Sequence, residues 1–173
     1  MGSQKAEGTG DKVRILFVCL GNICRSPAAE GILRQRLIDS ALDLEVLVDS
    51  AGTGGWHVGE LPDDRMRQAA KRRGYTLCHR ARQVQPHDFE TFDAIYGMDQ
   101  SNVKNLHRLA QGVNRNLLKI ESFGLLLGDR SFEIPDPYHG GPEGFERVLD
   151  LLEEGVNALV ARLQHNSFHH NHE

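Results

Sequence analysis

Residues 13–27 read VRILFVCLGNICRSP, an apolar run that leads into a short loop and a Ser-Pro pair. The apolar run predicts a buried β-strand. Ser26 and Pro27 predict the start of a helix, with Ser26 as its N-cap. Between them, Gly21 and Asn22 are residue types that readily enter left-handed backbone conformations. This order of strand, loop and helix is typical of an α/β fold in which the loop lies at the carboxyl end of the first strand.

The loop has the composition of an anion-binding site with a nucleophile at its base. Successive backbone N–H groups and a following helix N-terminus favour an anion, and Arg25 adds a planar fork of donors that matches two phosphate oxygens. We expect Cys19, facing these donors, to be an ionised nucleophile to which Ser26 can donate a hydrogen bond. The Cys-x5-Arg spacing alone is a weak signal, because a lone cysteine after a buried strand is more often a small core residue. The chain has no Walker A string, and no Gly-x-Gly-x-x-Gly follows this strand.

The composition indicates one globular domain. A chain of 173 residues can bury a sizeable core, and its net charge of −4 argues against general nucleic-acid binding. No apolar run approaches the roughly 20 residues that span a bilayer, and no signal peptide opens the chain. Three cysteines, one of them placed as a reactive thiol, fit a reducing compartment better than a disulfide scaffold. We therefore expect a soluble cytoplasmic protein that binds neither nucleic acid nor membrane.

Strand and helix signals alternate along the chain, which predicts a parallel sheet with helices on both faces. Strands are expected at 12–18, 44–49, 92–96 and 116–120, and helices at 27–40, 62–73, 86–90, 99–109 and 142–163. Gly74 is expected to be the C′ residue of the second helix, and Asp99 the cap of the fourth. Segments 1–11 and 166–173 are expected to be flexible tails that flank one domain at 12–165. The second tail is rich in histidine, which can bind metal adventitiously, but a disordered tail is the simpler interpretation.

A loop of about twenty residues separates the last predicted strand from the last helix, and such loops are usually functional. It contains IPDPYHGG at 134–141. Because ligands of open parallel sheets bind at the carboxyl ends of the strands, we expect this loop to reach the crevice beside Cys19. Cleavage of an aryl phosphate needs an acid for the leaving oxygen, and a partly buried carboxyl beside a dianion suits this task. Asp136, held between two prolines, is the candidate, and an ordinary turn aspartate is the alternative.

Five motifs of this chain have the order and spacing of one known family. They are VCLGNICRSP at 18–27, DSAGT at 49–53, HRAR at 79–82, Met98-Asp99 and DPY at 136–138. Over about residues 12–163 the chain resembles the low-molecular-weight protein tyrosine phosphatases. The resemblance implies a single flavodoxin-like domain with a four-stranded parallel sheet. It also implies hydrolysis of phosphotyrosine in proteins and of small aryl phosphates, through a phosphocysteine and with neither cofactor nor metal.

The resemblance assigns catalytic roles by matching position. Cys19 is the nucleophile, and Arg25 binds the phosphate. Asp136 is the general acid, and Ser26 assists the thiolate. The remaining phosphate-loop positions are Leu20, Gly21, Asn22, Ile23 and Cys24.

Further positions support the loop or line the cleft. The resemblance implies that Asn22 holds the strained loop through bonds to Ser50 and His79, whereas a surface histidine is the ordinary interpretation of His79. It also implies that Trp56 and Tyr138 line the cleft that holds the aromatic ring. Trp56 lies among glycines, so we expect it to be exposed.

Two positions bear on substrate preference and redox control. Many members of the family carry a second tyrosine where this chain has His139, which leaves open both the preference and any regulation through a tyrosine pair. Cys24 either packs as a small residue or, as the resemblance implies, forms a disulfide with Cys19 that prevents irreversible oxidation. Cys78 is interpreted as structural. Phosphotyrosine proteins are the implied partners, with a tyrosine kinase as one candidate, and a monomer or weak dimer is expected.

Three other functions compete with this interpretation. Related arsenate reductases share the loop and fold but use two further cysteines, and this chain offers only Cys78 outside the loop. A catalytically silent phosphotyrosine-binding protein predicts loss of the nucleophile or the acid, yet Cys19 and Asp136 are both present. In a transferase, the phosphocysteine would persist until a partner accepted its phosphoryl group, and Asp136 would have no clear role.

Overall fold

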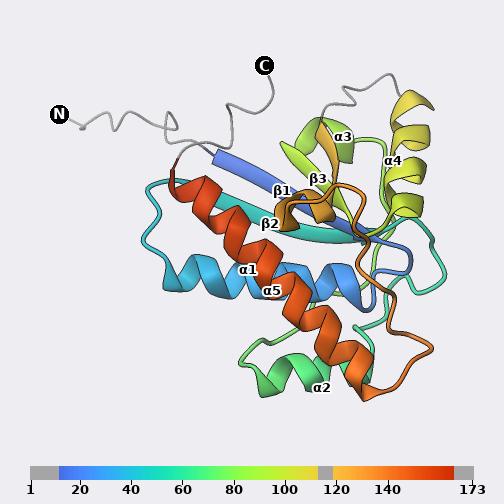
Figure 1. Cartoon of the computed structure of the whole chain (residues 1–173). Coiled ribbons are helices and arrows are strands. Elements are labelled where there is room, and N and C mark those ends of the chain that lie inside the picture. The colour runs from blue at the N-terminus through green and yellow to red at the C-terminus, as the bar shows by residue number, and fades with distance from the viewer. Residues whose placement is uncertain (1–11, 113–118, 166–173) are drawn as a thin grey trace.

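The computed structural model describes residues 12–112 and 119–165. In these ranges four strands form one sheet in the order β2-β1-β3-β4, and each neighbouring pair is parallel (Figure 1). The strands are β1 (Lys12–Cys19), β2 (Glu45–Gly52), β3 (Ala94–Gly97) and β4 (Ile120–Ser122). The helices are α1 (Arg25–Asp39), α2 (Asp64–Arg72), α3 (Asp88–Thr91), α4 (Gln100–Gly112) and α5 (Pro142–Gln164), with the 3₁₀ helix η2 (Phe123–Leu127) after β4. The predicted parallel α/β sheet is confirmed.

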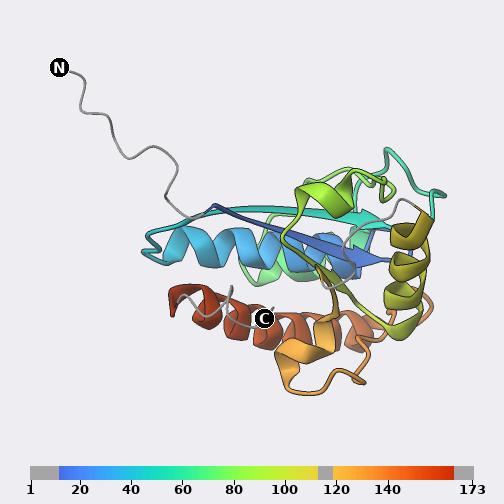
Figure 2. The ribbon, with the colours of Figure 1, turned by 90° about the horizontal axis from the view of Figure 1, so that it is seen from above.

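Helices cover both faces of the sheet, as Figure 2 shows for α1 and α5 on one side and α3 on the other. Ile15 and Phe17 of β1 join the core that includes α1, α2 and α5. Leu16 and Val18 join a second core with α3 and α4. Successive side chains of a strand point to opposite faces. Burial on both faces therefore explains why this strand is apolar without alternation.

Most elements lie where the sequence predicts them, with shifts at their ends. Gly74 follows α2 with a φ of 91°, the left-handed conformation expected of a C′ glycine. Asp99 caps α4, because its Oδ1 accepts the backbone N–H of Asn102 at 2.8 Å. Of the predicted strand at 116–120, only Ile120 belongs to β4 among the described residues; residues 116–118 and both predicted tails lie outside them. The long loop after that strand is not wholly irregular, because it contains η2.

The predicted N-cap of the first helix is wrong. α1 begins at Arg25, so Ser26 lies inside the first turn, and Cys24 is the N-cap residue. No side chain caps this end of the helix. The hydroxyl of Ser26 is instead engaged by the preceding loop, where it accepts from Asn22 at 2.8 Å. The first N–H groups of α1 consequently have no side-chain cap.

Across the part of the chain that the structure describes, none of the helices combines the length and the apolar character needed to cross a membrane.

Candidate active site

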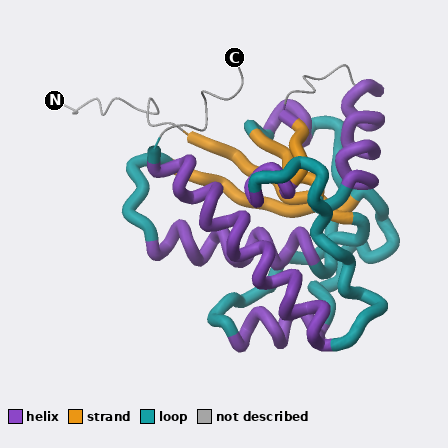
Figure 3. The backbone as a smooth tube through the Cα atoms, in the orientation of Figure 1, coloured by secondary structure: helices purple, strands orange, loops and turns teal. Residues whose placement is uncertain are grey.

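The loop after β1 forms the floor of a cleft at the carboxyl edge of the sheet. The segment after η2 reaches the same edge, so loops that are far apart in the sequence lie side by side (Figure 3). The cleft has a volume of about 210 Å³. Its lining residues are Cys19, Leu20, Gly21, Ile23, Cys24, Arg25, Trp56, His57, Asp136, Tyr138 and His139.

Cys19 lies at the base of this cleft, with 3% of its surface exposed. Its Sγ is 3.0 Å from Oγ of the buried Ser26, so the hydroxyl can donate to a thiolate. Cys24 is buried as well, and burial, followed by the charges of Asp63 and Cys19, raises the pKa of its thiol far above the ordinary value. Cys24 therefore stays protonated. Cys78, which the sequence suggested to be structural, is exposed, and all three cysteines are free.

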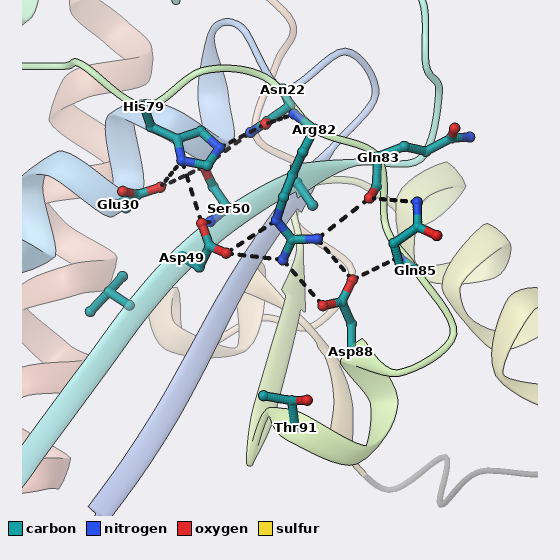
Figure 4. Close-up of polar contacts among 12 residues, drawn as sticks. Asn22, Glu30, Asp49, Ser50, His79, Arg82, Gln83, Gln85, Asp88 and Thr91 are labelled. Carbon is teal, nitrogen blue, oxygen red and sulfur yellow. Dashed lines mark hydrogen bonds and ion pairs between the residues drawn. The ribbon is translucent and has the colours of Figure 1, made fainter. Parts of the chain in front are cut away.

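Asn22 holds the loop that follows β1 through hydrogen bonds of its side chain. Its φ of 58° is the one positive value for a non-glycine residue in the described ranges, and asparagine enters this left-handed region more easily than other side chains do. Its buried amide donates to Oγ of Ser26 at 2.8 Å and to Oγ of Ser50 at 3.0 Å. Its Oδ1 lies 3.2 Å from Nε2 of His79 (Figure 4). The structure thus brings together the expected partners, and it adds the backbone N–H of Arg82, which donates to the same Oδ1 at 2.9 Å.

Arg25 enters the cleft from the first turn of α1 and is 3% exposed. Its Nη1 donates to Oδ2 of Asp99 at 2.7 Å and to the carbonyl of Ile134 at 3.0 Å, which fixes the plane of the guanidinium. Burial by itself lowers the pKa of Arg25, but the charges of Cys19, Asp99 and Asp136 outweigh it and raise the pKa above the ordinary value. Sequence analysis assigned Asp99 only a capping role, whereas one carboxylate caps α4 and orients Arg25.

Asp136 stands at the mouth of the cleft. Its Oδ2 lies 3.6 Å from Nη2 of Arg25, so the long loop does reach the site. Its Oδ1 accepts the backbone N–H of Tyr138 at 3.1 Å, which is a turn contact of the kind expected of an aspartate. The side chain is 46% exposed. It is therefore less buried than the sequence argument assumed.

Comparison with known proteins agrees with this geometry. The family model for low molecular weight phosphotyrosine protein phosphatase matches residues 14–169. The chain belongs to this family. A Synechocystis protein, named among the low molecular weight protein-tyrosine-phosphatases, is 46% identical over 155 residues, which cover 87% of this chain and 96% of the relative. The predicted family, its flavodoxin-like α/β fold and the enzyme class, a phosphatase, are thereby confirmed.

Solved structures of the phosphatase family share the fold. A protein tyrosine phosphatase from Entamoeba histolytica, with Hepes in its active site, has a TM-score of 0.80 at 39% identity; the match covers 90% of this chain and 99% of that one. A Drosophila arginine phosphatase has a TM-score of 0.80 at 34% identity; the match covers 86% of this chain and 96% of that one. Of these two similar structures, one is named a tyrosine phosphatase and the other an arginine phosphatase.

Aromatic side chains and two histidines form the rim of the phosphatase cleft. Trp56 is 73% exposed, as the sequence predicts, and Tyr138 is 39% exposed. His139 meets the ring of Tyr138 edge-on, with the ring centroids 4.9 Å apart. His57 was missed by sequence analysis, although its place beside Trp56 in a glycine-rich turn was a usable signal. Its ring lies 6.4 Å from that of Tyr138.

Behind the loop, Ser50 and His79 belong to a polar network whose acidic members, Glu30 and Asp49, sequence analysis missed. The buried Glu30 accepts from Oγ of Ser50 at 2.7 Å and lies 3.5 Å from Nδ1 of His79. Asp49 lies 3.4 Å from the same nitrogen. Glu30, Asp49 and His79 each offer a ligand atom within 4.8 Å of the others, so they have the spacing of a cation site. Arg82 already pairs with Asp49 at 3.0 Å, and the network is explained as support for His79.

Proposed function

We propose that this phosphatase hydrolyses phosphotyrosine in proteins, and small aryl phosphates, through a phosphocysteine on Cys19. One observation carries the proposal: Cys19, Arg25 and Asp136 line one cleft although the last lies far along the chain from the other two. They are a nucleophile, a receptor for the phosphoryl oxygens and an acid. These are the groups that cleavage of a phosphate ester requires.

In the first step the thiolate of Cys19 attacks phosphorus in line with the ester oxygen. The bond between phosphorus and the phenolic oxygen breaks, and Asp136 gives its proton to that oxygen. Arg25 and the loop N–H groups hold the other phosphoryl oxygens, so positioning and electrostatics supply most of the catalysis. The uncapped N-terminus of α1 adds its partial positive charge.

In the second step water attacks the phosphocysteine. The bond between phosphorus and sulfur breaks, inorganic phosphate leaves, and Asp136, now ionised, takes the proton of the attacking water. The leaving thiolate of Cys19 accepts a hydrogen bond from Ser26, whose Oγ lies 3.0 Å from the sulfur. A hydrogen bond to a charged group is stronger than one to a neutral group, so this contact favours release of the sulfur.

The depth and walls of the cleft favour a long, flat substrate side chain. Cys19 is only 3% exposed, so the phosphoryl group must be carried down into the cleft to reach it. Trp56 and Tyr138 stand at the opening, where they can pack on an aromatic ring. We expect phosphoserine, whose side chain is shorter and has no ring, to be hydrolysed more slowly. Phosphoarginine is the alternative substrate, since a Drosophila relative is named an arginine phosphatase and its side chain is also long.

The test measures hydrolysis of para-nitrophenyl phosphate by the wild type, Cys19→Ser and the control Cys78→Ser. We expect Cys19→Ser to lose turnover and Cys78→Ser to keep it, because Cys78 is exposed and does not line the cleft. Activity retained by Cys19→Ser would falsify the assignment of the nucleophile. The rates of hydrolysis of one peptide sequence, prepared with phosphotyrosine, with phosphoserine and with phosphoarginine, are then compared to identify the preferred substrate. A preference for phosphoarginine would overturn the proposed substrate and leave the two chemical steps in place.

We also propose that Cys24 protects Cys19 from irreversible oxidation. Peroxide converts the Cys19 thiolate to a sulfenic acid. The sulfur of Cys24 then attacks that sulfur and gives its proton to the departing hydroxyl, so that a disulfide forms and water leaves. Both thiols are free and belong to the same loop. After peroxide treatment, a thiol reductant is expected to restore activity in the wild type but not in Cys24→Ser. Equal irreversible loss in the two proteins would remove this proposal.

A reactive thiol keeps its function best in a reducing compartment, so we propose the cytoplasm as the location. Proteins that carry phosphotyrosine, among them a tyrosine kinase, are the proposed partners. Cell fractionation followed by capture with Cys19→Ser tests both statements. Recovery of the protein in an oxidising compartment would contradict the first.

A further inference from the structure

The backbone of Arg82 links the phosphate-binding loop to the end of β2. Its N–H donates to Oδ1 of Asn22 at 2.9 Å, and its carbonyl accepts from the N–H of Gly52 at 2.8 Å. The N–H of Val84 then donates to the carbonyl of Gly52 at 2.9 Å. These contacts make an isolated bridge rather than a full strand. The backbone of the preceding Ala81 also bonds to Gly59 and Glu60. The side chain of Arg82 adds a further anchor to this backbone pairing.

Two carboxylates anchor that side chain (Figure 4). Nη1 and Nη2 of Arg82 donate to the two oxygens of Asp88 at 3.0 and 3.2 Å, and Nε donates to Asp49 at 3.1 Å. Asp88 is 1% exposed and also accepts the N–H of Gln85 at 2.7 Å. Burial by itself lowers the pKa of Arg82, but the bonds to Asp88 and the charge of Asp49 raise it above the ordinary value. A bidentate guanidinium–carboxylate pair fixes orientation as well as distance.

The loop rests directly on the part of β2 that Arg82 holds. A Cβ at Gly52 would lie 2.7 Å from the carbonyl of Leu20 and 3.2 Å from the backbone nitrogen of Asn22. Packing this close leaves little room for the loop to move unless the end of β2 moves too. The contacts of Arg82 with Asp88 and Asp49 therefore help to fix two positions: that of the Asn22 side chain, and that of the end of β2 on which the loop packs.

We propose that Arg82 is a positioning residue for the phosphate-binding loop, held in place by Asp88 and Asp49. Arg82 is not among the residues that line the cleft, so it acts through Asn22 and not on the substrate. The inference rests on the proposed function in so far as the loop binds a phosphoryl group. It adds a requirement, since the loop N–H groups point at that group only while the Arg82–Asp88 pair is intact.

The test uses Arg82→Lys and Asp88→Asn. Lysine keeps the charge but lacks the planar fork, and asparagine keeps the shape but loses the charge. The matched control is Arg73→Lys. Arg73 is 23% exposed, against 28% for Arg82, and pairs with Glu146 and Asp150 between α2 and α5.

Four quantities are measured for each protein: the melting temperature, kcat and KM for para-nitrophenyl phosphate, and the phosphate concentration that halves alkylation of Cys19 by iodoacetamide. We expect Arg82→Lys and Asp88→Asn to raise KM and that phosphate concentration about tenfold, the effect of losing one hydrogen bond to a charged group. Arg73→Lys is expected to lower the melting temperature and leave both values unchanged.

The positioning role is overturned if both variants melt earlier, as the control does, but bind phosphate like the wild type. Should Arg82→Lys not fold, Asp88→Asn alone decides. A wild type that hydrolyses no aryl phosphate would contradict the proposed function. Protection of Cys19 by inorganic phosphate would still test the positioning role in that case.

Discussion

Asp99 makes two contacts, one that orients Arg25 and one that caps α4, and two substitutions can tell their effects apart. Oδ2 of Asp99 accepts from Arg25 at 2.7 Å, and Oδ1 accepts from the N–H of Asn102 at 2.8 Å. Asp99→Ser keeps an oxygen that can cap α4 but removes the carboxylate that fixes Arg25. Asp99→Ala removes both contacts.

The size of the effect follows from burial. A hydrogen bond to a charged group contributes about 1.5–3 kcal/mol. Arg25 is 3% exposed but the side chain of Asp99 is 21% exposed, so water replaces part of the contact. A loss of about 1.5–2 kcal/mol is therefore reasonable, which corresponds to a fall of about 10–30-fold in kcat/KM for Asp99→Ser. Asp99→Ala is expected to lose about 1 kcal/mol of stability in addition, from the missing cap.

Steady-state hydrolysis of para-nitrophenyl phosphate and thermal melting measure the two effects separately. Asp99→Ser and Asp99→Ala are expected to share the same reduced kcat/KM, and only the alanine variant should melt clearly earlier. A folded Asp99→Ser that keeps the wild-type kcat/KM would refute the argument that this carboxylate orients Arg25.

Three further changes test other parts of the structure. A Cβ on Gly155 would lie 2.3 Å from the ring of Phe123, so Gly155→Ala is expected to lower the free energy of unfolding by about 1–3 kcal/mol with kcat/KM unchanged; an unaltered urea midpoint would contradict this packing. The bond from Arg65 lowers the pKa of Asp63, so its stabilisation is present above the unfolded value of about 3.9 and is lost as pH falls through the lower folded value. Asp63→Asn should therefore lose less stability than the wild type between about pH 6 and about pH 2, and equal losses would argue against the pair. Asp136→Asn is expected to slow hydrolysis by about 10²–10⁴-fold. The slowing should be larger for phenyl phosphate than for para-nitrophenyl phosphate, because para-nitrophenol is the better leaving group. Equal slowing of the two substrates would mean that Asp136 does not protonate the leaving oxygen.

The parts of the site that lie close together in the sequence could be predicted from it. Cys19 and Arg25 lie at the two ends of one loop, and the strand and the helix that they belong to determine where that loop lies. Asp136 could be placed near them because parallel strands deliver their following loops to one edge of the sheet. The 3.6 Å contact between Asp136 and Arg25 agrees with that argument. The catalytic roles of these residues stay predictions until activity is measured.

Contacts between distant segments could not be predicted. The bond from Arg25 to Asp99 joins residues 74 positions apart, and the bond from Arg82 to Asn22 joins residues 60 apart. No local pattern around either partner specifies them, and Asp99 fits the ordinary rule for a helix cap equally well. Ser26 failed as a predicted cap for a related reason. Its hydroxyl is taken up by contacts to Asn22 and Cys19, which depend on how the loop folds.

The formation of a phosphocysteine is the central claim, and trapping it is the most direct test. Wild-type protein is quenched with denaturant at alkaline pH, where the phosphorus–sulfur bond survives, during turnover of para-nitrophenyl phosphate, and is then digested and analysed by mass spectrometry. One phosphoryl group on the peptide that contains Cys19, absent from Cys19→Ser, is the predicted result. Phosphate found on another residue, or turnover with no phosphorylated peptide in a rapid-quench time course, would contradict the account.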